Sequence, residues 1–128
     1  MRILKTKLLA RFTRRERISD ACLAEAIRRA ERGVIDADLG AGLIKQRVGR
    51  AGQGRSGGYR MVVAYRAGKR AVFLYGFAKS ERQNIGPDEL LSLREIAAGW
   101  LTADDLLIDR AIVAAALQEI NDDEASLF

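Results

Sequence analysis

Two apolar segments separated by three residues constrain the fold of this chain most. The segments YRMVVAYR (59–66) and RAVFLYGF (70–77) flank the tripeptide AGK, whose glycine suits a tight turn. Each segment has the length of a strand, and both are nearly continuous in apolar residues. Strands of this composition are usually covered on both faces. The sequence therefore predicts an antiparallel hairpin in the centre of a sheet.

The remaining segments predict helices before and after the hairpin, with further strands beside it. The predicted fold class is α+β: a small, mostly antiparallel sheet of about four strands, with two N-terminal helices and the C-terminal helices packed against it. Residues 34–42 are turn-like, and residues 121–128 are expected to form a loose tail. The expected elements are an edge strand at 1–7, helices at 8–17 and 18–33, strands at 43–50, 59–66 and 70–77, and helices at 86–100 and 103–120.

Several residues mark where these helices begin and end. Ser19 suits the N-cap of the second helix, and Gly33 suits its C-terminal end. Thr102 suits the N-cap of the last helix. On the second helix, Cys22 (or Leu23) belongs to an apolar stripe, which predicts a structural role for the cysteine.

The length of 128 residues predicts one domain, with an acidic helical C-terminal extension from about residue 103. No apolar run approaches the roughly 20 residues that span a bilayer. The first residues lack the apolar segment and cleavage site of a signal peptide. A single cysteine cannot form an intramolecular disulfide, which suits a reducing compartment. We therefore expect a cytoplasmic protein without membrane association.

The charge is divided unevenly along the chain. Residues 1–82 hold 20 basic and 7 acidic side chains, a net charge of +13, whereas residues 83–128 hold 2 basic and 10 acidic, a net charge of −8. A basic body favours a polyanionic partner. The acidic part would bind a basic partner or shield the basic face, and a solvated surface with uneven charges is the plainer alternative.

The residue types that are missing exclude several common catalytic centres. The chain has no histidine, so the usual general base and metal ligand is lacking. A lone Cys22 without a histidine argues against a thiol nucleophile. The segment GQGRSG contains G-x-G, but it lies between predicted strands instead of opening a helix, so it does not predict a nucleotide-binding loop. We expect neither a metal nor a cofactor.

Cationic side chains concentrate on the predicted hairpin and the strand before it. Lys45 and Arg47 share one face of their strand, and Arg60 interrupts a strand otherwise filled with apolar residues. A half-buried guanidinium needs a partner, which is either an acid of this chain, such as Glu81 or a C-terminal acid, or a phosphate group. The second alternative predicts an anion-binding face made of Lys45, Arg47, Arg50, Arg55, Arg60, Lys79 and Arg82.

Aromatic residues and a glycine-rich loop adjoin these cations. Arg50 and Arg55 belong to the loop before the hairpin, where they are expected to raise the affinity for an RNA backbone without taking part in chemistry. Tyr59, Tyr65, Tyr75 and Phe77 offer surfaces on which the bases of single-stranded RNA stack. Aromatic residues in central strands more often belong to the core, so we expect most of these four to be core residues.

The segment SGGYRMVVAYRAGKRAVFLYGFAKSER resembles the RelE-like toxins of bacterial toxin–antitoxin pairs. It is most similar to the HigB/RelE-like branch, with the pattern S-G-G-Y-R and then F-L-Y-G-F-A-K-x-x-R-x-N-I. The likeness extends through FTRRERISDACLAEAI, GVIDADLGAGLIKQRVGRAGQG and NIGPDELLSLREIA, so the matching segments lie between residues 12 and 97. The resemblance implies the compact RelE-like fold, which agrees with the predicted order of elements.

The resemblance also implies a function. RelE-like toxins inhibit translation as ribosome-dependent, metal-independent endoribonucleases that cleave messenger RNA in the decoding site. The 2′-hydroxyl attacks the adjacent phosphate and leaves a 2′,3′-cyclic phosphate and a 5′-hydroxyl. The implied partners are the ribosome, messenger RNA and a cognate antitoxin, often a helix-turn-helix protein encoded by the adjacent gene.

The family's site residues match five positions of this sequence. Arg60 of GGYR matches the central strand arginine that contacts the scissile phosphate. Lys45 and Arg47 match a K-x-K pair on the preceding strand, and Lys45 is the better candidate for proton transfer because an arginine stays protonated. Lys79 and Arg82 match the basic segment after the last core strand.

One departure and two alternative functions accompany this assignment. The best-known members carry a tyrosine after the basic segment, whereas this chain has QNIGP there. Tyr75 or Phe77 would then supply the stacking, and Lys79 or Glu81 the proton transfer.

The same scaffold carries ParE-like inhibitors of DNA gyrase, and a non-catalytic RNA-binding module is a further alternative. The basic strand pair and GGYR favour the nuclease.

Overall fold

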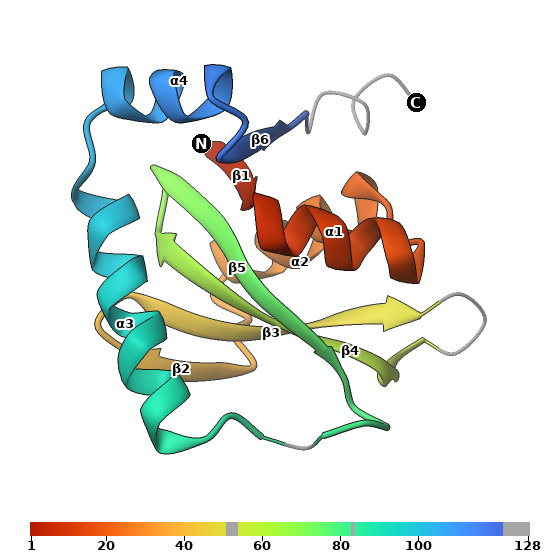
Figure 1. Ribbon diagram of the computed structural model, residues 1–128. Helices are drawn as coiled ribbons and strands as arrows, with labels where there is room; N and C mark the ends of the chain where they lie inside the picture. Colours follow the sequence, from red (N-terminus) through yellow and green to blue (C-terminus); the bar gives the residue numbers. More distant parts are fainter. Residues whose placement is uncertain (51–53, 83, 122–128) are drawn as a thin grey trace.

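The computed structural model describes residues 1–50, 54–82 and 84–121, without the side chains of residue 50 and residues 54–57. In this part of the chain, helices cover both faces of one mixed sheet (Figure 1). The elements in chain order are β1 (Arg2–Thr6), α1 (Lys7–Glu16), α2 (Asp20–Glu31), β2 (Ala37–Gly40), β3 (Leu43–Arg50), β4 (Gly54–Arg66), β5 (Arg70–Ala78), α3 (Pro87–Thr102), α4 (Asp105–Val113) and β6 (Leu117–Ile120).

The six strands lie in the order β2-β3-β4-β5-β1-β6. Strand β1 runs parallel to β5, and the other neighbouring pairs are antiparallel. The hairpin of β4 and β5 occupies the middle, with Tyr59 opposite Ala78 and Arg66 opposite Arg70. The predicted central hairpin and the α+β class are therefore confirmed. The prediction of about four strands was too low.

Strand β6 replaces the end of a predicted helix. The helix expected over 103–120 begins at Asp105 and ends at Val113, and Ala115 takes a left-handed conformation with φ of 63°. Leu117 and Ile120 are buried where β6 pairs with β1. Ala114, Ala115 and Ala116 favour a helix by local propensity. Without β6, however, the backbone N–H and C=O groups on the outer edge of β1 would lack partners, and a strand satisfies them. The same pairing makes β1 an internal strand, so the predicted edge position was wrong.

Strand β2 lies within the segment predicted to be turn-like. It pairs with β3, and the reversal between them places Gly40, Ala41 and Gly42 at positive φ. A glycine adopts such angles at little steric cost, which explains two of the three residue types at this turn. A strand of only four residues is too short to show an alternating pattern in the sequence.

Helix ends follow the predictions in part. The Ser19 side chain caps α2 as predicted, accepting a hydrogen bond from the Cys22 backbone N–H at 3.2 Å. Of the two alternatives for the apolar stripe of α2, Leu23 is buried and Cys22 is exposed, so Leu23 is confirmed and the place of the cysteine in the stripe was wrong. Asp104, in place of Thr102, caps α4 by accepting a hydrogen bond from the Leu107 backbone N–H at 2.8 Å.

Each face of the sheet carries its own apolar core. Helices α1 and α2 cover the face that holds Met61 and Phe73, whereas α3 and α4 cover the face that holds Val62. On β4, the core under α3 ends at Val62, and the next residue on that face is Arg60. Helix α3 therefore does not cover one end of this sheet face, and polar residues lie there. In the residues described, no helix is long and apolar enough to cross a membrane.

Candidate functional site

Three of the predicted cations lie together on the face that α3 leaves open. Strands β3 and β4 pair so that Arg47 stands opposite Arg60 and Lys45 stands opposite Val62. Because side chains alternate along a strand, Lys45, Arg47 and Arg60 project from the same face. We call these three residues the cationic strand site.

Arg60 is the most enclosed member of the site. Its residue exposure is 8%, and its Nη1 donates to the Tyr59 carbonyl oxygen at 3.4 Å. Burial lowers the pKa of Arg60, the nearby Arg47 guanidinium lowers it further, and Asp36 acts in the opposite direction. Both lowering effects make the charged guanidinium unfavourable, and an anion bound beside Arg60 would relieve both.

Arg47 and Lys45 flank Arg60 with different surroundings. Arg47 is exposed, and its side chain forms no ion pair with any residue that the structure describes. The Lys45 Nζ lies 3.5 Å from Asn84 Oδ1, so the segment between β5 and α3 passes next to this end of the site. The pair of guanidinia and one ammonium group suits a phosphate with several charged oxygens.

A buried polar network under β3 fixes the position of this strand. Gln46 is fully buried and donates to the carbonyl oxygens of Ala26 and Val34, while its Oε1 accepts from the Asp36 backbone N–H. The Asp36 carboxylate accepts from the Arg47 backbone N–H at 2.7 Å. Sequence reasoning did not single out these residues. The sequence feature that could have revealed this network is Gln46, because it is a polar residue on the strand face that the apolar Ile44 and Val48 share.

Arg29 completes this network from α2. Its side chain is 5% exposed and pairs with Glu25 at 3.0 Å and with Asp36 at 3.4 Å. It also donates to the backbone carbonyl oxygen of Arg47. Helix α2 thereby holds the strand that carries two members of the cationic strand site.

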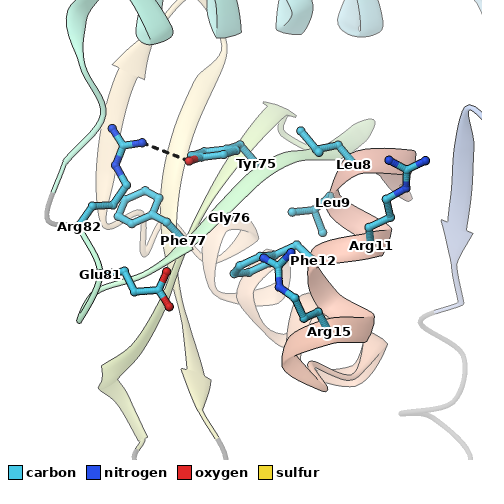
Figure 2. A pocket seen from close by; sticks show the side chains of 10 residues that line it. All are labelled: Leu8, Leu9, Arg11, Phe12, Arg15, Tyr75, Gly76, Phe77, Glu81 and Arg82. Atoms are coloured by element: carbon cyan, nitrogen blue, oxygen red, sulfur yellow. Dashed lines mark hydrogen bonds between the residues drawn. The ribbon is translucent and has the colours of Figure 1, made fainter.

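Arg82 is held by an acid of this chain. Its guanidinium makes two hydrogen bonds to Glu89, at 2.6 Å and 3.1 Å. A third hydrogen bond, to the Tyr75 hydroxyl at 3.2 Å, is drawn in Figure 2. Its Nε donates to the Asn84 carbonyl oxygen, and its guanidinium carbon lies 5.6 Å from the centre of the Phe77 ring. The hydrogen bonds to Glu89 and to the Tyr75 hydroxyl raise the pKa of Arg82, and the hydrogen bonds from Arg82 and from the Gly86 backbone lower the pKa of Glu89 to about 2. Arg82 therefore links the segment after β5 to the first turn of α3.

The aromatic candidates divide between the two faces. Tyr59 is buried on the α1 side, where its ring meets Phe12 edge to face at 5.7 Å and its hydroxyl donates to Glu16. The structure thus places Tyr59 away from the cationic strand site. Phe77 pairs with Arg60 across the strands, but its ring is 4% exposed and lies against Arg82. Tyr75 is half-buried, 6.0 Å from Phe77.

The remaining candidates lie at the ends of the strands. Lys79 is exposed just after β5, and its backbone N–H donates to the Gly58 carbonyl oxygen. The side chains of Arg50 and Arg55 lie outside the part that the structure describes. Across the described residues, no group of three or more His, Cys, Asp or Glu side chains is arranged to hold a metal ion.

Comparison with known proteins gives one match. The model of a protein family described as "RelE toxin of RelE / RelB toxin-antitoxin system" matches residues 1–120. No curated protein sequence matches the chain.

Proposed function

The chain belongs to the RelE toxin family, and we propose that it is a toxin that cleaves messenger RNA at the ribosome. Its partner within the toxin–antitoxin pair is a cognate antitoxin. The fold alone does not determine the activity, because one scaffold carries several functions. The proposal therefore rests on the chemistry of the cationic strand site.

One observation carries the proposal: two guanidinia stand opposite each other on neighbouring strands, and one of them is buried. Like charges directly across a sheet destabilise it, and a buried guanidinium is costly. An anionic ligand bound here would place negative charge beside both guanidinia and reduce their mutual repulsion. The phosphodiester of RNA supplies that charge in the form that arginine binds best.

In the proposed reaction, the 2′-oxygen of one nucleotide attacks the adjacent phosphorus while the bond from phosphorus to the 5′-oxygen of the next nucleotide breaks. The proton of the 2′-hydroxyl passes to a base, and the leaving 5′-oxygen receives a proton. Arg60 and Arg47 bind the non-bridging oxygens, on which negative charge accumulates in the transition state. Lys45 lies on the same face and is the proposed proton-transfer group. Lys79 is proposed to contact the RNA backbone.

The site assignment is tested with Arg60→Ala and a matched control, Arg66→Ala. Both arginines lie on β4, but Arg66 is exposed at the far end of the strand. Removing a preorganised transition-state donor costs roughly 10²–10³ in rate. We expect purified Arg60→Ala to cleave ribosome-bound messenger RNA slower by about that factor, with Arg66→Ala close to wild type.

The activity itself is tested by mapping messenger RNA 5′ ends after brief expression of the wild-type chain. Cuts within translated codons, with 5′-hydroxyl and 2′,3′-cyclic phosphate ends, support the proposal. A DNA-damage response without such cuts would instead indicate an inhibitor of DNA gyrase. Undiminished cleavage by Arg60→Ala would leave the nuclease in place and refute the site.

A further inference from the structure

Asp36 places a negative charge beside the cationic strand site. Its carboxylate accepts a hydrogen bond from the Arg47 backbone N–H at 2.7 Å, and its side chain is 21% exposed. Arg47 in turn stands opposite Arg60 on the neighbouring strand. Burial and the Arg47 guanidinium lower the pKa of Arg60, whereas the charge of Asp36 raises it. A site that suits RNA phosphates therefore has an anion of the protein itself next to it.

The Asp36 carboxylate lies on an edge of β3 that strand β2 does not reach. The pairing of β2 with β3 stops where Ala37 stands opposite Lys45, two residues before Arg47. Beyond that point, the side chain of Asp36 binds the Arg47 N–H, and the side chain of Arg29 binds the Arg47 carbonyl oxygen. Two side chains thus pair the backbone groups that a longer β2 would have paired.

The hydrogen bond to Arg47 does not require a charge at residue 36. The amide oxygen of an asparagine accepts a hydrogen bond from the same kind of donor. The charge itself opposes the binding of an anion, because a carboxylate repels a phosphate bound beside Arg47 and Arg60. Arg29 offsets this charge in part, since its guanidinium is shared between Glu25, at 3.0 Å, and Asp36, at 3.4 Å. The charge and the hydrogen bond of Asp36 therefore have separable effects.

We propose that Asp36 is a positioning residue whose charge weakens the binding of RNA phosphates at the cationic strand site. Its hydrogen bond holds the β3 backbone at Arg47, while its carboxylate reduces the affinity of the two guanidinia for an anion. A nuclease must release the cleaved RNA before it acts again, and a lower affinity for phosphates speeds that release. This inference rests on the proposed nuclease and deepens it, because it gives a role to an acid that does not itself contact the RNA.

The test measures how tightly the full chain binds a non-cleavable 2′-O-methyl RNA oligonucleotide at low and at high salt. Asp36→Asn removes the charge and keeps an oxygen that can accept from the Arg47 N–H. Asp38→Asn is the matched control, because it removes the same charge and Asp38 also accepts from a backbone N–H, that of Gly40, at 2.9 Å. Asp38 stands opposite Ile44, three residues along β3 from Arg47, which is roughly 10 Å.

Asp36→Asn should bind the RNA about two- to tenfold more tightly than wild type at low salt, and Asp38→Asn should stay within about twofold. The gain should shrink as the salt concentration rises, because salt screens the repulsion between Asp36 and a phosphate. It should also be smaller in the Arg60→Ala background, because RNA bound elsewhere on the basic surface does not sense Asp36.

A purely structural role for Asp36 predicts no gain in affinity, since its replacement would only loosen β3. The proposal is refuted if Asp36→Asn, shown to be folded by circular dichroism, binds the RNA as wild type does or more weakly. It is equally refuted if Asp38→Asn tightens binding as much, or if no variant binds RNA at low salt. Asp36→Ser, which keeps a hydroxyl oxygen as acceptor, gives the same comparison if Asp36→Asn does not fold. Absence of messenger RNA cleavage by wild type would refute the nuclease and is measured separately, so the two failures are distinguishable.

Discussion

Replacing Gln46 with leucine should lower the free energy of unfolding by about 2–4 kcal/mol. The Gln46 side chain is fully buried under α2 and bonds three backbone groups: the carbonyl oxygens of Ala26 and Val34, at 2.9 Å and 3.1 Å, and the N–H of Asp36, at 2.8 Å. Leucine fills a similar volume but can bond none of them. The cost is roughly 1–3 kcal/mol for the buried Ala26 carbonyl and about 0.5–1.5 kcal/mol for each of the two partly buried groups. The larger apolar surface of leucine offsets part of this sum.

The assay is urea unfolding followed by the fluorescence of Trp100, the single tryptophan, together with far-ultraviolet circular dichroism. Gln118→Leu is the matched control, since Gln118 is exposed on β6 and its replacement should change the free energy by less than about 0.5 kcal/mol. The reasoning fails if Gln46→Leu unfolds at the same urea concentration and with the same slope as wild type. In that case the network under β3 would not hold the strand that carries Lys45 and Arg47.

Three further changes probe the cationic strand site, the link to α3 and the α1 contact. Arg47→Gln should raise the free energy of unfolding by about 0.2–1 kcal/mol, because it removes an exposed positive charge that stands directly opposite Arg60. A loss of stability of Arg47→Gln in urea unfolding would contradict this account. Arg82 lowers the pKa of Glu89 from 4.5 to about 2. The ion pair between them therefore stabilises the fold fully above pH 4.5, and this stabilisation is lost as the pH falls towards 2. Glu89→Gln should make the melting temperature depend less on pH between 4.5 and 2, and an unchanged pH dependence would show that this ion pair does not cause it. Gly76→Ala should cost about 1–3 kcal/mol because its Cβ meets Met61 and Phe12. A neutral result in thermal unfolding would show that α1 moves away from β5 freely.

The parts of the fold that could be predicted are those with a local cause. The central hairpin follows from two apolar runs around a turn, and the α2 cap follows from Ser19. Strand β6 has no such cause, because the alanines before it favour a helix and its partner β1 lies more than a hundred residues away in sequence. The family resemblance is confirmed by the match over residues 1–120.

The site was predictable to the extent that it depends on strand alternation. Lys45 and Arg47 share a face because they are two residues apart, and Tyr59 cannot share the face of Arg60 because the two are consecutive. The pairing of Arg82 with Glu89 could not be read in this way. It depends on the path of the segment between β5 and α3, which brings two residues seven positions apart into contact.

The position of Arg60 connects stability with binding in this protein. Its neighbours across and along the sheet are Phe77 and Val62, which would suit an apolar side chain, and Arg47 opposite it adds repulsion. An anion bound beside Arg60 would reduce the repulsion from Arg47, so part of the binding free energy is the relief of that repulsion. It follows that a phosphate-bearing ligand should stabilise the wild-type fold by mass action, and should do so much less for Arg60→Met. A ligand that raised the stability of both equally would bind elsewhere, and the repulsion between Arg47 and Arg60 would then need another explanation.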